Sequence, residues 1–432
     1  MSPRILILGG GYVGMYTALR LQRKLRRGEA RVTVIDADSY MTYQPFLPEA
    51  AAGNLEPRHV VVPLRRVLNR CTLLSGWATA IDVAGRTVDF SPHRGESRKI
   101  EYDVLIVAPG SVSRTLPIPG LAECGIGFKT VEEAIHLRNH VLAQLELAAS
   151  TTDQAVRREA LTFVFVGAGF AGVEALAELE DMAHDALRYY PELKADELRW
   201  YLIEATDRIL PEVGPEMGRW TLEQLRARGI DVRLGTKLES AKDGRIVLDD
   251  GTEFDAATLV WTAGVKPHPI VRHSDLPIDA KGRVKATSRL TVEGVDGVFA
   301  AGDCAAVPDL TNPGEYTAPN AQHAVRQTKV LADNVLAHLR GGKMGDYRHA
   351  YAGSVASLGL HKGVAQIYGR RLRGPLAWFV HRTYHLSRVP TVNRKVRVLI
   401  DWTLALFFRR EIVALGALSE PRREFELATR DK

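Results

Sequence analysis

The chain has 432 residues, of which 46% are hydrophobic and 25% are charged, and its formal net charge is +6. This length exceeds that of a domain built on one hydrophobic core, so two or three domains are expected. The composition excludes a disordered chain. Three cysteines lie far apart and form no CxxC pair. Their spacing argues against a disulfide framework, a zinc site or an iron–sulfur cluster.

The start of the chain enters a predicted strand at Arg4–Leu8 and lacks the features of a signal peptide. No stretch approaches the roughly 20 uninterrupted apolar residues that cross a bilayer. We therefore expect a protein on the cytosolic side that, where it meets a membrane, lies on the surface.

The first 36 residues predict a strand, a glycine turn, a helix and a second strand. The strand Ile5–Leu8 leads into the turn, a helix is expected over Tyr16–Arg26, and the strand Arg31–Ile35 ends at Asp36. The turn has the GxGxxG spacing at Gly9, Gly11 and Gly14. In this context the first glycine permits a tight turn, the second lets a pyrophosphate approach, and the third lets helix and strand pack closely. Asp36 is placed to accept hydrogen bonds from a ribose.

The same architecture recurs in the middle of the chain, after a predicted helix over Glu132–Ala149, and it begins with the strand Leu161–Val166. The second turn contains Gly167, Gly169 and Gly172. The next strand, Trp200–Ile203, is followed by Glu204, beyond a crossover longer than usual that predicts extra helix outside the sheet. A carboxylate here favours NADH over NADPH because it repels a 2′-phosphate, although Arg208 could soften that preference.

A third segment, Gly297–Asp303, predicts a strand at Val298–Ala300 that returns to the first domain, before a helix from about Ala321. Asp303 would hold the ribityl or phosphate groups of FAD; the alternative is a simple helix cap.

With these motifs the chain resembles the two-dinucleotide-binding-domain flavoproteins and, among them, the type II (non-proton-pumping) NADH:quinone oxidoreductases. The resemblance rests on Gly9–Gly14, Val166–Glu174, Trp261–Val265, Ala301–Asp303 and Ala321–Ala324. It implies FAD in the first domain, NADH in the second and a quinone near Ala321 and Gln322. Two positions depart from the family pattern: Asp36 replaces the usual glutamate, and Pro109 stands where threonine is common.

The resemblance also implies which further residues contact the cofactors. For FAD these are Tyr12, Val13, Ala108, Gly110, Gly302, Ala321 and Gln322, and for NADH they are Phe170, Ala171, Ala263 and Gly264. Glu174 resembles the family's glutamate near the nicotinamide, with an orienting or proton-handling role; the alternative is a carboxylate that complements the helix dipole. Gln322 is a candidate hydrogen-bond donor to a quinone carbonyl, and His361 or Lys362 could lie at the same opening.

The loop Tyr43–Ala50 looks like the cysteine-free loop of the quinone reductases, where disulfide reductases of the superfamily carry a redox cysteine pair. Without such a pair, electrons should pass from the flavin directly to an acceptor. We expect no resident metal. His381 and His385 have i, i+4 spacing, but we interpret them, with Arg388, as a polar helix face.

The predicted fold class is α/β, with two Rossmann-like domains, the NADH domain inserted in the FAD domain, and a C-terminal membrane-surface region. The expected boundaries are 1–115 and 287–350 for the FAD domain, 116–286 for the NADH domain and 351–432 for the C-terminal region.

Between His361 and Arg410 the sequence has eleven basic residues and a single acid, Asp401. Leu376, Phe379, Val380, Thr383 and Leu386 fall near one helical face, and Val398–Phe408 is largely apolar but about half a bilayer span long. We expect this region to bind an anionic membrane surface; the alternative is a solvated basic face over a buried helix.

Together these features predict an FAD-dependent NADH dehydrogenase that reduces a membrane quinone, as a peripheral protein on the cytoplasmic face of the cell membrane. A soluble NAD(P)H reductase with a ferredoxin-type partner and a flavin-bound NADH sensor with little turnover remain as alternatives. A homodimer stays open, and no nucleic-acid partner is expected.

Overall fold

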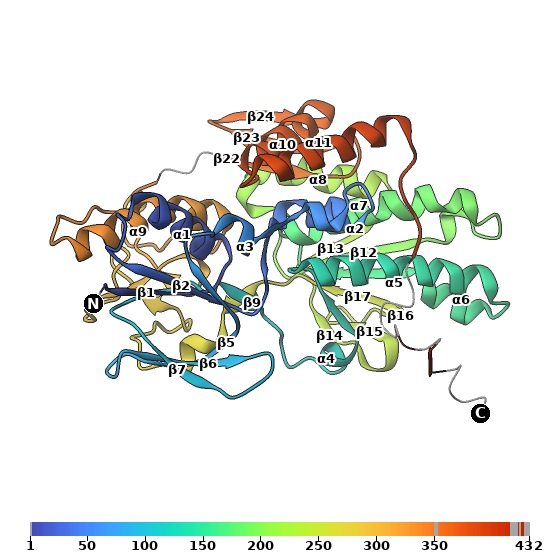
Figure 1. The fold of residues 1–432 in the computed structure, drawn as a ribbon. Helices are drawn as coiled ribbons and strands as arrows, with labels where there is room; N and C mark the ends of the chain where they lie inside the picture. Colours follow the sequence, from blue (N-terminus) through green and yellow to red (C-terminus); the bar gives the residue numbers. More distant parts are fainter. Residues whose placement is uncertain (1, 350–352, 415–421, 423–424, 427–432) are drawn as a thin grey trace. The chain divides into compact units, whose positions relative to one another are not determined.

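The computed structural model describes residues 2–349, 353–414, 422 and 425–426. The chain folds into two compact units (Figure 1). The first comprises Met1–Thr42, Val61–Arg114 and Val265–Tyr351, and the second comprises Tyr43–Val60, Thr115–Gly264 and Ala352–Lys432. The segment Tyr43–Val60 therefore groups with the second unit, whereas the division expected from the sequence gave it to the first domain. The four-part domain boundaries stay predictions.

The first unit is built on a seven-stranded sheet of order β20-β8-β1-β2-β5-β6-β7. Its strands in this order are Val298–Ala300, Val104–Val107, Arg4–Leu8, Arg31–Asp36, Thr72–Asp82, Thr87–Pro92 and Arg98–Glu101. The strands from β20 to β5 pair in parallel, and β5, β6 and β7 pair antiparallel. The buried run Val104–Val107 is apolar throughout because both faces of a central parallel strand are covered.

Two long helices of the first unit, α1 (Tyr12–Lys24) and α9 (Ala321–Leu339), pack against each other (Figure 1). The predicted start of α9 is confirmed, but α1 begins four residues before the predicted Tyr16. Shorter elements complete the unit: β3 (Tyr40–Thr42), β4 (Val61–Pro63), α3 (Leu64–Val67), β9 (Ser111–Ser113), β18 (Val265–Pro267), β19 (Val284–Lys285) and β21 (Ala305–Ala306).

The second unit is built on a five-stranded parallel sheet of order β10-β17-β11-β12-β13. Its strands in this order are Gly125–Gly127, Thr258–Trp261, Thr162–Val166, Arg199–Glu204 and Asp231–Leu234. The helices of this unit are α2 (Leu47–Ala51), α4 (Leu121–Cys124), α5 (Val131–Ser150), α6 (Gln154–Ala160), α7 (Phe170–Ala186), α8 (Pro215–Ala227), α10 (Gly374–Arg388) and α11 (Val392–Phe407). Helix α5 begins with a capping box between Thr130 and Glu133.

Two small antiparallel sheets also belong to the second unit. One contains β14 (Leu238–Ser240), β15 (Arg245–Leu248) and β16 (Glu253–Asp255), and the other contains β22 (Gly353–Ser357), β23 (Gly363–Ile367) and β24 (Arg370–Arg373). Short 3₁₀ helices lie at Gln44–Phe46, Pro57–His59, Leu187–Tyr189, Ala195–Glu197, Pro211–Val213, Lys242–Gly244, Pro269–Arg272 and Gly302–Cys304. Two of them follow α7 in the long crossover, where extra helix was predicted.

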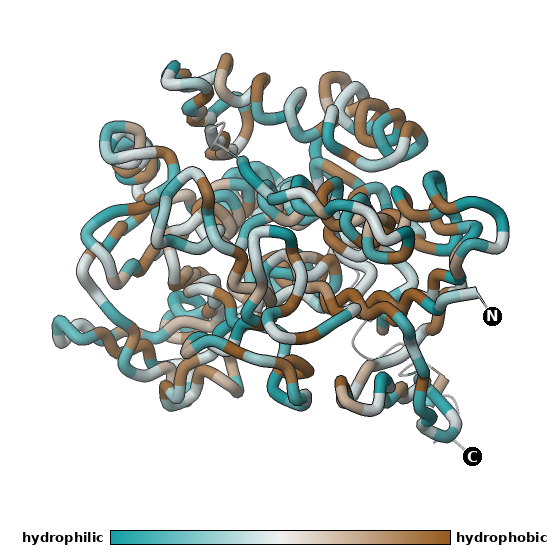
Figure 2. The backbone as a smooth tube through the Cα atoms, turned by 90° about the vertical axis from the view of Figure 1, so that its left-hand side faces the viewer, coloured by the Kyte–Doolittle hydropathy of each residue, from teal (hydrophilic) through white to brown (hydrophobic). Residues whose placement is uncertain are grey.

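The repeated strand, glycine turn and helix in the two largest sheets confirm the predicted α/β class. Hydrophobic residues occur in short stretches separated by hydrophilic ones along the described backbone (Figure 2). Among the described residues, every helix is too short or too polar to cross a bilayer.

Two candidate dinucleotide-binding sites

In the first unit, the turn between β1 and α1 gives each glycine of the motif a different surrounding. Gly9 has a φ of +95°, which favours glycine. A Cβ on Gly14 would collide with the carbonyl oxygen of Gly9, so this glycine allows α1 to pack on the turn. A Cβ on Gly11 would meet nothing within 4 Å. Gly11 is also the N-cap of α1 and supplies no side-chain cap, so the N–H groups of the helix start are open to a phosphate.

Asp36 lies at the end of β2, where the sequence predicted it, and holds the turn in place. Its Oδ2 accepts a hydrogen bond from the N–H of Gly10, and its Oδ1 accepts one from Asp38 at 2.8 Å. Burial raises the pKa of Asp36 to about 6. The carboxylate therefore stands beside the glycine turn, as a ribose acceptor must.

The returning segment brings Asp303 to the same unit. Ser111 Oγ donates to Asp303 Oδ2 at 2.6 Å, and the N–H of Gly302 donates to Gln327 Oε1 at 2.7 Å. Gly110 has a φ of +73° and open space around it, and the carbonyl of Ala108 lies against Gly9. Ser111 and the fully buried Gln327 were missed from the sequence, because only the fold brings them to this turn.

Helix α9 begins at Ala321 and is capped by Asn320, whose side chain accepts from the N–H of His323 at 2.9 Å. His349 Nε2 lies 3.2 Å from Gln322 Oε1, where the imidazole N–H donates to the amide oxygen. Burial, followed by the charge of Arg326, lowers the pKa of His349 to about 4, so the ring is neutral near pH 7. The contact with His349 was not predicted, since 27 residues separate the two side chains.

In the second unit, the turn between β11 and α7 repeats this construction. Gly167 has a φ of +105°, and a Cβ on Gly172 would collide with its carbonyl oxygen. A Cβ on Gly169 would meet nothing within 4 Å, and the start of α7 has no side-chain cap. Phe170 opens the helix and is partly buried, Ala171 is exposed, and Ala263 and Gly264 follow β17 beside the turn.

Glu204 occupies the place in the second unit that Asp36 has in the first. Its Oε2 accepts from the N–H of Ala168 at 2.7 Å, and its Oε1 accepts from the N–H of Thr206 at 2.9 Å. Thr262 Oγ1 lies 2.9 Å from the carbonyl oxygens of both Val166 and Gly167. Thr262 was also missed, because its role depends on the neighbouring strand β17.

Glu174 lies one turn into α7 and is buried by the C-terminal region. Its Oε1 accepts from the N–H of Ser357 at 2.8 Å and lies 3.1 Å from His381 Nε2. The interpretation of His381 as part of a polar helix face is therefore wrong: this side of α10 packs inward, and His381 is buried against Glu174. His361 packs edge-on against Trp378, and Lys362 lies 3.7 Å from Asp181.

The three cysteines are free thiols; Cys71 and Cys304 lie in the first unit and Cys124 lies in the second. Cys304 is buried, and burial raises its pKa to about 12; burial also raises the pKa of Cys71 to about 11. Cys124 is exposed, and its pKa is raised as well. Thiols with raised pKa values supply little thiolate near pH 7, so these residues do not form a thiol relay.

Comparisons with known proteins agree with this geometry. A family model described as pyridine nucleotide-disulphide oxidoreductase matches residues 3–328. The type II NADH:quinone oxidoreductase Ndh of Mycobacterium tuberculosis is 29% identical, covering 94% of this chain and 89% of that protein. The mitochondrial internal alternative NAD(P)H-ubiquinone oxidoreductase A1 of Arabidopsis thaliana is 30% identical, covering 95% and 85%.

Among solved structures, NDH2 of Plasmodium falciparum in complex with NADH has a TM-score of 0.86 at 19% identity, covering 96% of this chain and 100% of that one. This likeness supports the fold. The chain belongs to the pyridine nucleotide-disulphide oxidoreductase family and, within it, to the type II NADH:quinone oxidoreductases.

Proposed function

We propose that this protein is an FAD-dependent NADH dehydrogenase that passes the two electrons of NADH to a membrane quinone. The observation that carries the proposal is the pair of matching turns, in which a carboxylate at the end of the next strand accepts from a turn N–H. Each turn leaves open space at its second glycine and uncapped N–H groups at the helix start. Two such turns fit two dinucleotides, one resident and one exchanged.

FAD would be held in the first unit. Gly11 leaves room for its pyrophosphate, and Asp36 would accept hydrogen bonds from its ribose. Asp303 would accept hydrogen bonds from its ribityl or phosphate hydroxyls. The remaining contacts proposed for FAD are Gly9, Tyr12, Val13, Gly14, Ala108, Gly110, Gly302, Ala321 and Gln322. When bound, the flavin supplies the redox chemistry, and the protein provides binding and orientation.

NADH would be held in the second unit by the equivalent residues. Gly169 leaves room for the pyrophosphate, Glu204 is the acceptor for the adenosine ribose, and Glu174 orients the nicotinamide end. Gly167, Phe170, Ala171, Gly172, Ala263 and Gly264 complete the proposed contacts. In this role the carboxylate of Glu204 disfavours NADPH, because it would repel the 2′-phosphate.

Gln322 is the residue we propose to donate a hydrogen bond to a quinone carbonyl. A neutral His349 that donates to Gln322 Oε1 turns the amide NH₂ group away from the histidine. This arrangement supports a hydrogen bond to a carbonyl acceptor, which a quinone has and oxygen lacks.

The C-terminal helices support binding to an anionic membrane surface. On α10 and α11 the exposed apolar side chains include Leu376, Phe379, Leu399, Ile400, Leu404, Leu406 and Phe407. The only acid of the basic span, Asp401, turns inward and lies 2.6 Å from His59 Nδ1. The outward surface therefore combines apolar and basic side chains, which suits the interface of a bilayer with anionic lipids. We propose a peripheral protein on the cytoplasmic face, with a homodimer left as a further proposal.

A single steady-state assay separates this function from its alternatives. The purified flavoprotein should oxidise NADH rapidly with a short-chain quinone and slowly with oxygen alone or with ferredoxin. Faster turnover with ferredoxin would favour the soluble reductase, and negligible turnover with every acceptor would favour the sensor.

A further inference from the structure

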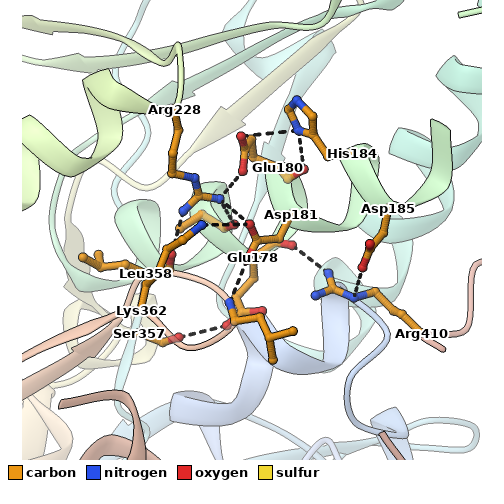
Figure 3. A network of polar contacts seen from close by, with 12 residues as sticks. Glu178, Glu180, Asp181, His184, Asp185, Arg228, Ser357, Leu358, Lys362 and Arg410 are labelled. Carbon is orange, nitrogen blue, oxygen red and sulfur yellow. Dashed lines mark hydrogen bonds and ion pairs between the residues drawn. The ribbon is translucent and has the colours of Figure 1, made fainter. Parts of the chain in front are cut away.

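Helix α7 has acidic side chains along one face, at Glu174, Glu178, Asp181 and Asp185. Figure 3 shows polar contacts of the last three of these side chains. Most of these carboxylates have a basic partner. Asp181 lies 2.8 Å from Arg228, Asp185 lies 2.8 Å from Arg188 and 3.6 Å from Arg410, and Glu174 has His381. Within the part of the chain that the structure describes, the Glu178 carboxylate has no ion pair.

Glu178 is 1% exposed and has two neutral partners. Asn54 Nδ2 donates to its Oε2 at 3.0 Å, and Ser357 Oγ donates to its Oε1 at 2.9 Å. A buried carboxylate without a cation is costly to ionise. The geometry therefore singles out Glu178 as the carboxyl on this helix face that most readily keeps a proton.

Charged groups face Glu178 from each element packed around it. They are Glu49 on α2, Arg382 on α10, Arg410 beyond α11 and Asp181 on α7 itself. Glu174, which contacts His381 of α10, precedes Glu178 by about one turn of α7. Arg382 is engaged by Glu49 at 2.7 Å, and Arg410 meets Glu178 only at its backbone oxygen, at 3.1 Å. Burial and then Glu49 raise the pKa of Glu178 to about 7, despite the opposing effect of the two arginines.

Ser357 connects this carboxyl to the proposed nicotinamide end of the site. Its backbone N–H donates to Glu174 Oε1 at 2.8 Å while its hydroxyl donates to Glu178 Oε1 at 2.9 Å. A movement of Glu174 would therefore alter the hydrogen bond to Glu178, because Ser357 bonds to both side chains.

We propose that Glu178 is a positioning residue that exchanges a proton with solvent in step with the charge of the dinucleotide at Glu174. The inference rests on the proposed function. A nicotinamide that carries a positive charge stabilises nearby carboxylates, so binding of NAD⁺ releases a proton from Glu178, and its departure restores that proton. The step is an acid dissociation, in which the O–H bond of the carboxyl breaks, the proton goes to water and no electrons move.

The test is proton release when NAD⁺ binds to the FAD-loaded protein, measured with a pH indicator in weak buffer. We expect the wild type to release a fraction of a proton per NAD⁺ bound, most of it near pH 7, and Glu178→Gln to lose most of this release. The amide can keep both hydrogen bonds, to Asn54 and to Ser357. Glu180→Gln is the matched control, because Glu180 is a buried carboxylate of the same helix that pairs with Arg228; it should release as much as wild type.

Ser357→Ala provides a second variant should Glu178→Gln fail to fold. It keeps the backbone N–H that donates to Glu174 and removes the hydroxyl that donates to Glu178. The ionised form of Glu178 then loses a hydrogen bond, so the pH of maximal proton release should move upward. The inference would be overturned if Glu178→Gln, or Ser357→Ala in its place, released as many protons as wild type at the same pH of maximal release. The proposed function would stay intact in that case. Failure of the wild type to bind NAD⁺ would overturn the proposed function as well.

Discussion

Two glycines of the first turn, three residues apart, have opposite surroundings. Gly11 faces open space, whereas Gly14 touches the backbone of Gly9. Gly11→Val should therefore fold but lose at least about 90% of its bound flavin, because the side chain fills the space for the pyrophosphate. Gly14→Ala should instead destabilise the fold by roughly 3 kcal/mol, since the backbone must move.

Flavin absorbance of the purified variants and their thermal unfolding measure the two effects separately. Full flavin occupancy in Gly11→Val would show that the pyrophosphate does not approach this glycine.

Glu204 is the residue through which the protein should distinguish NADH from NADPH. Glu204→Gln keeps the size of the side chain and removes its charge, so the preference for NADH should fall about ten-fold, or ~1.4 kcal/mol. Ratios of kcat/KM for the two nucleotides measure this change. Asp207→Asn, at an exposed acid nearby, is the control and should leave the ratio unchanged. A wild type that prefers NADPH would mean that Arg208 governs the ribose end.

The glycines and both acids could be predicted because their spacing within one βαβ unit is local information. Thr262, Gln327 and His349 could not, because each reaches its turn or partner from a distant segment. His381 was misjudged for the same reason: the helical pattern of α10 reveals two faces, but only the tertiary fold shows that one of them covers Glu174.

Helices and strands with strong local patterns were predicted well. Strand β20 has the bounds that were predicted for it, and α5 was predicted within one residue at each end. The start of helix α1 was predicted four residues too far along the chain, because glycine-rich sequence is typical of turns. In the structure Gly11 is the N-cap of this helix. The hairpins from β22 to β24 were not predicted, since basic and apolar residues mix there without clear alternation.

Helices α10 and α11 have an inner face that packs on the second unit and an outer face with exposed apolar side chains. The inner face includes Arg382 and Trp402, which both donate to the buried Glu49. Removing the chain after Arg373 would therefore damage the fold as well as lipid binding. A sharper variant changes only the outer face.

The double substitution Leu406→Ser and Phe407→Ser removes side chains that are 74% and 78% exposed. It should lower the liposome partition constant obtained from sedimentation at least about a hundred-fold and leave flavin content unchanged, because burial of these side chains in lipid contributes about 1.5–3 kcal/mol each. Tyr189→Ser, at another exposed aromatic residue, is the control. Undiminished sedimentation of the double variant would contradict the proposed surface.

The proton held by Glu178 also links stability to pH. Because folding raises the pKa of Glu178 from about 4.5 to about 7, its contribution to stability is greatest below pH 4.5 and is lost as the pH rises to 7. Glu178→Gln should therefore increase the free energy of unfolding at pH 8 by about 1–3 kcal/mol and change it little at pH 5. Urea unfolding at the two pH values measures this difference. A variant less stable than wild type at pH 8 would contradict the account of Glu178.

The chain as a whole repeats the strand, glycine turn and helix in both of its units. The prediction that an NADH domain interrupts an FAD domain came from two similar motifs and a returning strand, and β20 does pair with β8 of the first sheet. The surroundings of the two turns differ: the first unit contains the hydrogen bonds from Ser111 to Asp303 and from Gly302 to Gln327, whereas α7 of the second unit carries Glu174, which accepts from Ser357.

The central claim is that electrons of NADH pass through a bound flavin to a quinone, and one anaerobic titration tests it most directly. One equivalent of NADH should bleach the absorbance of the bound flavin, and one equivalent of a short-chain quinone should restore it, with NAD⁺ and quinol formed in equal amounts. A protein that binds no flavin, a flavin that NADH fails to bleach, or a bleached flavin that the quinone fails to restore would contradict the account.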